Sequence, residues 1–186
     1  MRPVSPEVSG RAFLGLIKHV KETYGATSVA ELLPSLPAST QQVFKGRILH
    51  ATWYPYDAYV GLLKGLAQKY GGGSAEFCRE LGAASGTRDI NTVFRIYLAI
   101  ASTERLIRGC TKVWASYYRN AGTMEALRWE PEDTLLRITD FPQMAPEHCR
   151  LMEGWMITTM NLLGAESACA AKGAPAHEFK CRWKKR

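Results

Sequence analysis

The stretch TMEALRWEPEDTLLRITD, residues 123–140, decides the class of fold. It divides into two segments of strand character, 123–129 and 133–140, joined by the turn-like residues 130–132. In the second segment Leu136 and Ile138 alternate with Arg137 and Thr139. Alternation with a period of two is typical of a strand with one buried face. The sequence therefore predicts two strands of an antiparallel sheet here.

The residues that follow predict one helix and a second hairpin. Pro146 and Glu147 open a helical segment that runs to Leu163 and is closed by Gly164. Two further strand-like segments, 166–172 and 177–183, flank Gly-Ala-Pro at 173–175. The C-terminal third therefore has the predicted order β-β-α-β-β.

The residues that precede position 123 predict helices. Apolar residues recur at helical spacing in 11–24, in 56–70 and in a long segment from Asp89 to about Arg119 that has a possible interruption near Ser102. Shorter helices are expected at 28–33, 38–47 and 75–85. The predicted fold is α+β, a helical block packed on one side of an antiparallel sheet. We expect a single domain over 1–186, with a helical part (1–121), a β-β-α-β-β part (122–183) and a basic tail (184–186).

Composition and charge narrow the class of protein. The chain has 186 residues with 46% hydrophobic and 22% charged residues, which is ordinary for a globular domain. Its apolar stretches are too short to span a bilayer and no secretory signal is evident, so a cytoplasmic location is expected. The net charge of +7 is concentrated in residues 85–119 and 177–186. A basic tail can contact nucleic acid, but without a recognised nucleic-acid motif the simpler interpretation is a solubilising terminus.

The sequence shows no constellation that predicts catalysis. Gly71-Gly72-Gly73-Ser74 lacks the Lys-Ser/Thr of a P-loop and is interpreted as a helix terminator. No Gly-x-Ser-x-Gly elbow occurs. Cys149 is adjacent to His148, and neighbouring helical residues point about 100° apart, which is poor geometry for activating a thiol. We therefore expect a protein that is not an enzyme.

The C-terminal third contains a candidate metal site. The five cysteines form an odd set without a signal peptide, which argues against a disulfide framework. A hairpin centred on Gly173 would place Cys169 opposite His177, with Cβ atoms about 5 Å apart. Cys149 near a helix start and Glu166 upstream of Cys169 complete a set that zinc accepts. The alternative is that these cysteines are structural and the histidine is a surface residue.

The nineteen aromatic residues suggest either an aromatic core or an apolar ligand pocket. They crowd the junction at 53–59 and recur at helical spacing between 94 and 117. The pocket interpretation assigns ligand contacts to Trp53, Tyr56, Tyr59, Phe94, Tyr97, Trp114 and Tyr117.

Several motifs carry a resemblance to known families. Residues 11–183 resemble a family of uncharacterised proteins that is abundant in myxobacteria, through ATWYPY (51–56), FCRELG (77–82), TVFR (92–95), WASYY (114–118), DFP (140–142), HCR (148–150) and Gly154-Trp155. The end, CAAKGAPAHEF (169–179), resembles the close of the 4-vinyl reductase (V4R) domain, a relative of haem nitric-oxide-binding domains and Bet3-type trafficking subunits.

The resemblance implies a sensor or binding module with a helical block against an antiparallel sheet. It also implies a structural zinc site at Cys149, Glu166, Cys169 and His177, because the spacings Cys149-x4-Gly154 and Glu166-x2-Cys169 match those of V4R sensors of phenolic compounds. His177 stands where those sensors have a cysteine. Bet3 relatives suggest an acylated cysteine at Cys110, for which a core thiol is the simpler interpretation. The haem-binding relatives hold the iron through a histidine in the middle helices. This chain has no histidine between His50 and His148, so no haem is expected.

The expected function is a cytoplasmic sensory module that binds a small apolar or aromatic molecule and signals to a separate partner protein, as a homodimer. The alternative is a protein-interaction scaffold or regulatory adaptor with a solid core. A cavity between helices and sheet would favour the sensor, and a solid core would favour the scaffold.

Overall fold

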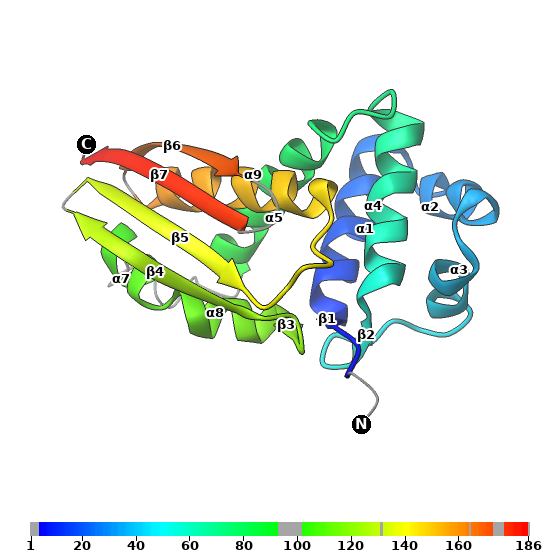
Figure 1. The fold of residues 1–186 in the computed structure, drawn as a ribbon. Helices are drawn as coiled ribbons and strands as arrows, with labels where there is room; N and C mark the ends of the chain where they lie inside the picture. The colour runs from blue at the N-terminus through cyan, green and yellow to red at the C-terminus, as the bar shows by residue number, and fades with distance from the viewer. Residues whose placement is uncertain (1–3, 93–101, 131, 164, 173–176, 186) are drawn as a thin grey trace.

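The N-terminal half of the chain is a block of helices (Figure 1). The computed structural model describes residues 4–92, 102–130, 132–163, 165–172 and 177–185. In α1 (Gly10–Tyr24) the Ser9 side chain accepts a hydrogen bond from the Arg11 backbone N–H, and Gly25 at φ 102° follows the last turn. The elements that follow are α2 (Ser28–Leu32), the short 3-10 helix η1 (Leu33–Ser35), α3 (Ala38–Phe44) and α4 (Tyr56–Tyr70).

A small three-stranded sheet joins the two ends of this block. Strand β1 (Glu7–Ser9) pairs antiparallel with β2 (Trp53–Pro55) on one side and with β3 (Tyr118–Arg119) on the other. An ion pair between Glu7 and Arg119 reinforces the second pairing across 2.5 Å. The sheet thereby holds residues 7–9, 53–55 and 118–119 together next to the start of α4.

The C-terminal part has the β-β-α-β-β order that the sequence predicts. It consists of β4 (Thr123–Glu130), β5 (Asp133–Thr139), α9 (Pro146–Leu162), β6 (Ala165–Lys172) and β7 (His177–Lys185). The four strands form an antiparallel sheet in the order β4-β5-β7-β6. Leu136 and Ile138 are buried on β5, as their alternation predicts.

The middle of the chain differs from the prediction at one boundary. Helix α5 (Phe77–Thr92) continues past position 85, so Asp89 lies inside this helix and does not begin a new one. Ser102 does mark an interruption, because it caps α7 (Thr103–Arg108) and accepts from the Arg105 backbone N–H. Helix α8 (Cys110–Tyr117) follows. The expected aromatic positions 94 and 97 lie outside the described residues.

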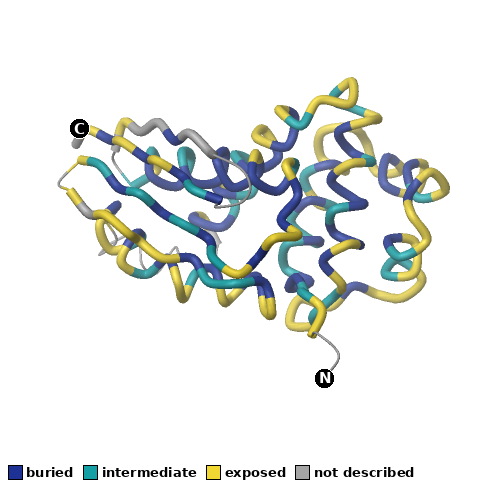
Figure 2. Tube along the Cα trace, in the orientation of Figure 1, coloured by how far each residue is buried: buried dark blue, intermediate teal, exposed yellow. Residues whose placement is uncertain are grey.

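The core lies where α9 packs between the sheet and α5. Among the described helices, these two make the most extensive contact. Glycines permit their close approach: a Cβ on Gly82 would lie 1.9 Å from the Leu151 carbonyl oxygen, and one on Gly154 would lie 1.9 Å from the Arg79 carbonyl oxygen. Figure 2 shows α9 buried along most of its length. The predicted α+β fold is therefore confirmed, and within the described residues no helix is long and apolar enough to cross a bilayer.

Candidate functional site

A small cavity lies between the helical block and the sheet. Its volume is about 60 Å³. Its walls come from both halves of the chain: Arg11, Ala12, Gly15, Tyr59, Ser85, Arg88, Asp89, Leu106, Ile107, Cys110, Val113, Trp114, Tyr117, Tyr118, Met124, Leu136, Leu151, Met152, Trp155, Met156 and Met160. A cavity of roughly 150 Å³ is known to hold one benzene molecule, so this one has room for a few waters but not for an aromatic ring.

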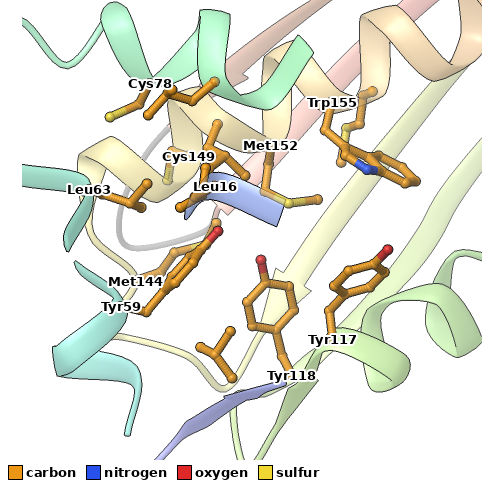
Figure 3. Close-up of a cluster of buried hydrophobic side chains, with 14 of the residues drawn as sticks. Leu16, Tyr59, Leu63, Cys78, Tyr117, Tyr118, Met144, Cys149, Met152 and Trp155 are labelled. Carbon is orange, nitrogen blue, oxygen red and sulfur yellow. The ribbon is translucent and has the colours of Figure 1, made fainter. Parts of the chain in front are cut away.

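The walls of this central cavity are mostly apolar and adaptable. Four of the six methionines of the chain line it, and three of them lie on α9. Methionine has three rotatable bonds and a polarizable sulfur, so it repacks around ligands of different shape. Figure 3 shows Met152 and Trp155 of α9 facing the hydroxyl-bearing edges of Tyr117 and Tyr118.

A few polar groups converge on the cavity from four helices, α1, α5, α8 and α9. The Trp155 indole N–H donates to the Asp89 carboxyl group over 2.8 Å, and both residues are buried. The Tyr117 side chain is only 8% exposed, and its hydroxyl lies close enough to Asp89 and Arg11 to interact with both but meets neither in good hydrogen-bond geometry. The Nε of Arg11 is likewise buried without a partner in the described part of the chain, and the Arg11 guanidinium lies 5.4 Å from the centre of the Tyr117 ring.

Burial shifts the titration of these groups. It raises the pKa of Asp89, although the hydrogen bond from Trp155 opposes this shift. Burial also raises the pKa of Tyr117, and the neighbouring Asp89 carboxylate raises it further, so this phenol stays protonated. An unpartnered phenol and an unpartnered guanidinium N–H at one cavity are two donors that a ligand with an acceptor group would satisfy.

The structure brings together three of the seven predicted ligand residues. Tyr59, Trp114 and Tyr117 line the cavity. Tyr56 is buried nearby but contacts His148 instead, and Trp53 lies at the surface sheet under the guanidinium of Arg119. The other two, Phe94 and Tyr97, lie outside the described residues.

Sequence reasoning missed the polar half of this site. Asp89 was interpreted as a helix start, whereas it lies inside α5 and is buried, and α5 has no marked apolar face that would have indicated this burial. Trp155 was considered only as part of a resemblance. Nothing in the spacing of Asp89 and Trp155 indicates that α5 and α9 pack in direct contact.

Next to the cavity, His148 joins the two halves of the fold. It is fully buried, and its Nδ1 is hydrogen bonded with the Tyr56 hydroxyl over 3.0 Å while its Nε2 is hydrogen bonded with the Tyr118 hydroxyl over 2.8 Å. Burial lowers the pKa of His148 to about 3. A neutral imidazole has one donor and one acceptor nitrogen, which suits two phenol partners. This histidine is therefore a structural connection, and both of its nitrogens are occupied.

The predicted zinc site is wrong. Cys169 forms a disulfide with Cys181, its directly opposed residue in the β6–β7 pair, so the expected absence of disulfides is wrong as well. The register of that pair is displaced by four residues from a hairpin centred on Gly173, and His177 pairs with Ile138 of β5. Among the described residues, no group of three or more His, Cys, Asp or Glu could hold a metal ion.

Strand geometry explains why the four residues do not converge. Glu166 and Cys169 are three residues apart on β6, so their side chains point to opposite faces of the sheet, and Glu166 is exposed while Cys169 is buried. Cys149 does approach His177, with 3.3 Å between Sγ and Nδ1. Burial raises the pKa of Cys149 to about 11 and lowers the pKa of His177, so both groups are neutral at pH 7.

Comparison with solved structures identifies the fold. The chain superposes on the unliganded Fe(II) H-NOX protein from K. algicida with a TM-score of 0.73 at 9% identity, over 96% of this chain and 97% of that one. An H-NOX domain from Shewanella oneidensis gives 0.72 at 14% identity, over 96% and 99%. An oxygen-binding H-NOX domain related to soluble guanylate cyclases gives 0.71 at 13% identity, over 95% of each chain. This chain therefore has the H-NOX fold.

Other comparisons give no assignment. No protein-family model matches the chain, and no curated protein matches it. The expected relationship to haem nitric-oxide-binding domains is confirmed at the level of fold. The finer resemblance to V4R, Bet3-type and myxobacterial families is not confirmed.

The expectation that no haem is bound is contradicted by the H-NOX neighbours. A further neighbour, at a TM-score of 0.67 and 14% identity, is described as a case in which distortion of the porphyrin by the protein modulates the haem redox potential. The exclusion rested on a missing histidine, yet cysteine thiolate also binds haem iron, and Cys110 lines the cavity. Arg11 and Arg88 supply positive charge at the same place. These donor types are compatible with haem, but burial raises the pKa of Cys110, and a cavity of about 60 Å³ does not admit a porphyrin unless its walls separate. The residues as arranged therefore do not fit the group.

Proposed function

We propose that the protein is a sensory module whose ligand enters the central cavity and separates the helical block from the sheet. The observation that carries this proposal is the pair of unpartnered buried donors, the Tyr117 hydroxyl and the Arg11 Nε, at a cavity with otherwise apolar walls. Leaving a buried donor unpaired costs about 1–3 kcal/mol. A ligand that supplies an acceptor recovers this free energy.

The chemistry of the walls defines the class of ligand. Methionine, leucine and aromatic side chains favour an apolar or aromatic body. The Arg11 guanidinium offers only N–H donors, so the acceptor group is best a carboxylate, a phenolate or a carbonyl oxygen. The ligand class is therefore a small aromatic or apolar molecule with one acceptor group.

The cavity must expand to admit a ligand, so binding moves the helical block relative to the sheet. This movement is the signal of the module. The cavity walls belong to both halves of the fold, with α1 and α5 on one side and α8, β4 and β5 on the other. A ligand that wedges between them binds the open arrangement better than the closed one, which is the requirement for a conformational shift. A separate partner protein and a homodimer remain predictions for how the shift is transmitted.

The small volume of the cavity favours a second candidate function. A core with about 60 Å³ of free space is nearly solid, as expected for a protein-interaction scaffold. In that case the unpartnered donors would bind only water. A cavity-filling substitution distinguishes the two functions, because it weakens ligand binding only if the ligand occupies the central cavity.

We further propose that no turnover occurs. Cys149 and His177 are the thiol and imidazole in closest contact, but both are buried and neutral, and neither lines the central cavity. A thiol with a raised pKa in a buried position is inert.

Titration with 2-naphthoate, an aromatic body with one carboxylate, tests the proposal. Trp114 and Trp155 line the cavity, so occupancy changes tryptophan fluorescence. We expect saturable binding of 2-naphthoate, weakened about tenfold by Tyr117→Phe through the loss of one hydrogen bond of about 1.4 kcal/mol. Tyr24→Phe, a half-exposed position outside the cavity, should bind as the wild type does. Probe binding that Tyr117→Phe and a cavity-filling Val113→Trp both leave unchanged would favour the scaffold.

A further inference from the structure

A second concavity lies on the helical block, away from the central cavity. It has a volume of about 630 Å³ and shares no lining residue with the central cavity. It is bounded by α1, α2, η1 and the segment that follows α3. Its lining residues are Leu14, Ile17, Lys21, Ala26, Val29, Ala30, Leu33, Phe44, Gly46, Arg47, Ile48, Leu49 and His50. Pockets of about 300–1,000 Å³ are typical of small-molecule sites.

The floor of this groove is apolar because α1, η1 and α3 leave apolar side chains incompletely covered. Leu14 and Ile17 lie on the same face of α1 and remain half-buried. Leu33 and Phe44 close the far side and are half-buried as well. Leu49, on the connecting segment, is 52% exposed. Nine of the thirteen lining residues have apolar side chains, so the groove offers a continuous apolar surface.

All charged groups of the lining are basic. Lys21 from α1 and Arg47 from the segment after α3 line the groove together with His50, and no carboxylate lines it. In the described part of the chain neither Lys21 nor Arg47 forms an ion pair.

The nearest acidic residues of the same helices are engaged elsewhere. Glu22 of α1 pairs with Lys18 over 3.8 Å, and Glu31 of α2 pairs with Lys69 over 3.3 Å. The positive charge of the groove is therefore not neutralised by its own elements. An apolar floor with an uncompensated basic rim is complementary to a molecule with an apolar chain and a negative head.

We propose that this groove binds a small anionic amphiphile, an alkyl chain that carries one carboxylate. The chain lies over Leu14, Ile17 and Phe44, and the carboxylate pairs with Lys21 and Arg47. Arg47 can bind the carboxylate through two parallel N–H groups. This site does not depend on the function proposed for the central cavity, because the two share no residue.

Calorimetric titration of the full chain with decanoate, below the concentration at which it forms micelles, tests this proposal. We expect saturable binding of one equivalent that the double variant K21M/R47M weakens at least tenfold. Lys18→Met removes a positive charge from the same helix outside the groove and should change the affinity less than twofold. The neutral analogue 1-decanol should bind at least tenfold more weakly than decanoate.

A blocking variant separates this groove from the central cavity. Ala30 is exposed and lines the groove, so Ala30→Trp fills it without disturbing the core. Decanoate binding should be lost in Ala30→Trp and retained in Val113→Trp. The proposal is overturned if wild type shows no saturable binding, if 1-decanol binds as tightly, or if K21M/R47M or Ala30→Trp binds as wild type does.

Discussion

Tyr56 and His148 form a buried hydrogen bond of 3.0 Å that connects the helical block to α9. The Tyr56 hydroxyl also accepts the backbone N–H of Ala145, over 3.0 Å, just before α9 begins. The Tyr56 hydroxyl therefore fixes both the start of α9 and the orientation of the His148 ring. The central cavity lies directly beyond this contact, since Tyr118, the second partner of His148, lines it.

The buried His148 predicts a specific loss of stability in acid. Its pKa is about 3 in the folded state and about 6.5 when unfolded, so the unfolded state binds one more proton between these pH values. The free energy of unfolding should therefore fall by about 1.4 kcal/mol per pH unit as the pH drops from 6.5 toward 3, and be unaffected by this group above pH 7. Urea unfolding at a series of pH values measures the slope.

The variant His148→Gln isolates this contribution from other titrating groups. Glutamine offers one donor and one acceptor but does not titrate, so the slope of wild type minus variant reports His148 alone. His177 has a lowered pKa and acts in the same direction, while Asp89 has a raised pKa and acts in the opposite one. Equal slopes in wild type and His148→Gln would show that His148 is not buried as described.

The crossing of α5 and α9 predicts a strong effect of one added methyl group. In Gly82→Ala the new Cβ would meet the Leu151 carbonyl oxygen at 1.9 Å, and since this Cβ is fixed to the α5 backbone and the oxygen belongs to the α9 backbone, neither can move without shifting its helix. We expect a loss of about 3 kcal/mol in the free energy of unfolding, the upper end for overpacking. Chemical denaturation measures it.

The matched control is Gly46→Ala. A Cβ at Gly46 meets nothing within 4 Å, so this substitution should change stability by less than about 0.5 kcal/mol. If Gly82→Ala were as stable as Gly46→Ala, the two helices would have to be farther apart than they are here.

The disulfide predicts sensitivity to reductant where the zinc hypothesis predicted sensitivity to chelator. Cys169 and Cys181 close a loop with a sequence separation of 12, for which the entropy model gives about 3 kcal/mol. Tris(2-carboxyethyl)phosphine should therefore lower the free energy of unfolding by about 2–3 kcal/mol. EDTA should have no effect. In the variant C169A/C181A the reductant should have no effect either, and stabilisation by added zinc in wild type would contradict the pairing.

Local pattern was enough to predict the α+β class and the elements of the C-terminal part, but it did not predict the small sheet of β1, β2 and β3. The alternation of Leu136 and Ile138, the proline at the start of α9 and the terminator Gly71 act over a few residues, and the segments that they define appear in the structure within about three residues. The continuous helix through Asp89 was missed because a polar residue at a buried position imitates a helix start.

The site was predictable only in part, since it depends on contacts between distant segments. Tyr59, Trp114 and Tyr117 were identified because aromatic residues recur at helical spacing in their segments and aromatic side chains commonly line ligand pockets. The register of β6 against β7 was not predictable from the Gly-Ala-Pro turn, and an error of four residues exchanged Cys181 for His177 as the partner of Cys169. A short-range geometric argument therefore produced a metal site where the chain has a disulfide.

Native mass spectrometry of the full chain, purified without denaturation from its own host, tests the central claim most directly. Val113 lines the cavity and is half-buried, so Val113→Trp fills the cavity from its edge. The account predicts that wild type carries a small-molecule adduct that is released on denaturation, and that Val113→Trp, folded by circular dichroism, lacks it. Wild-type protein without an adduct, or an adduct that Val113→Trp retains in full, would contradict a ligand-binding function for the central cavity.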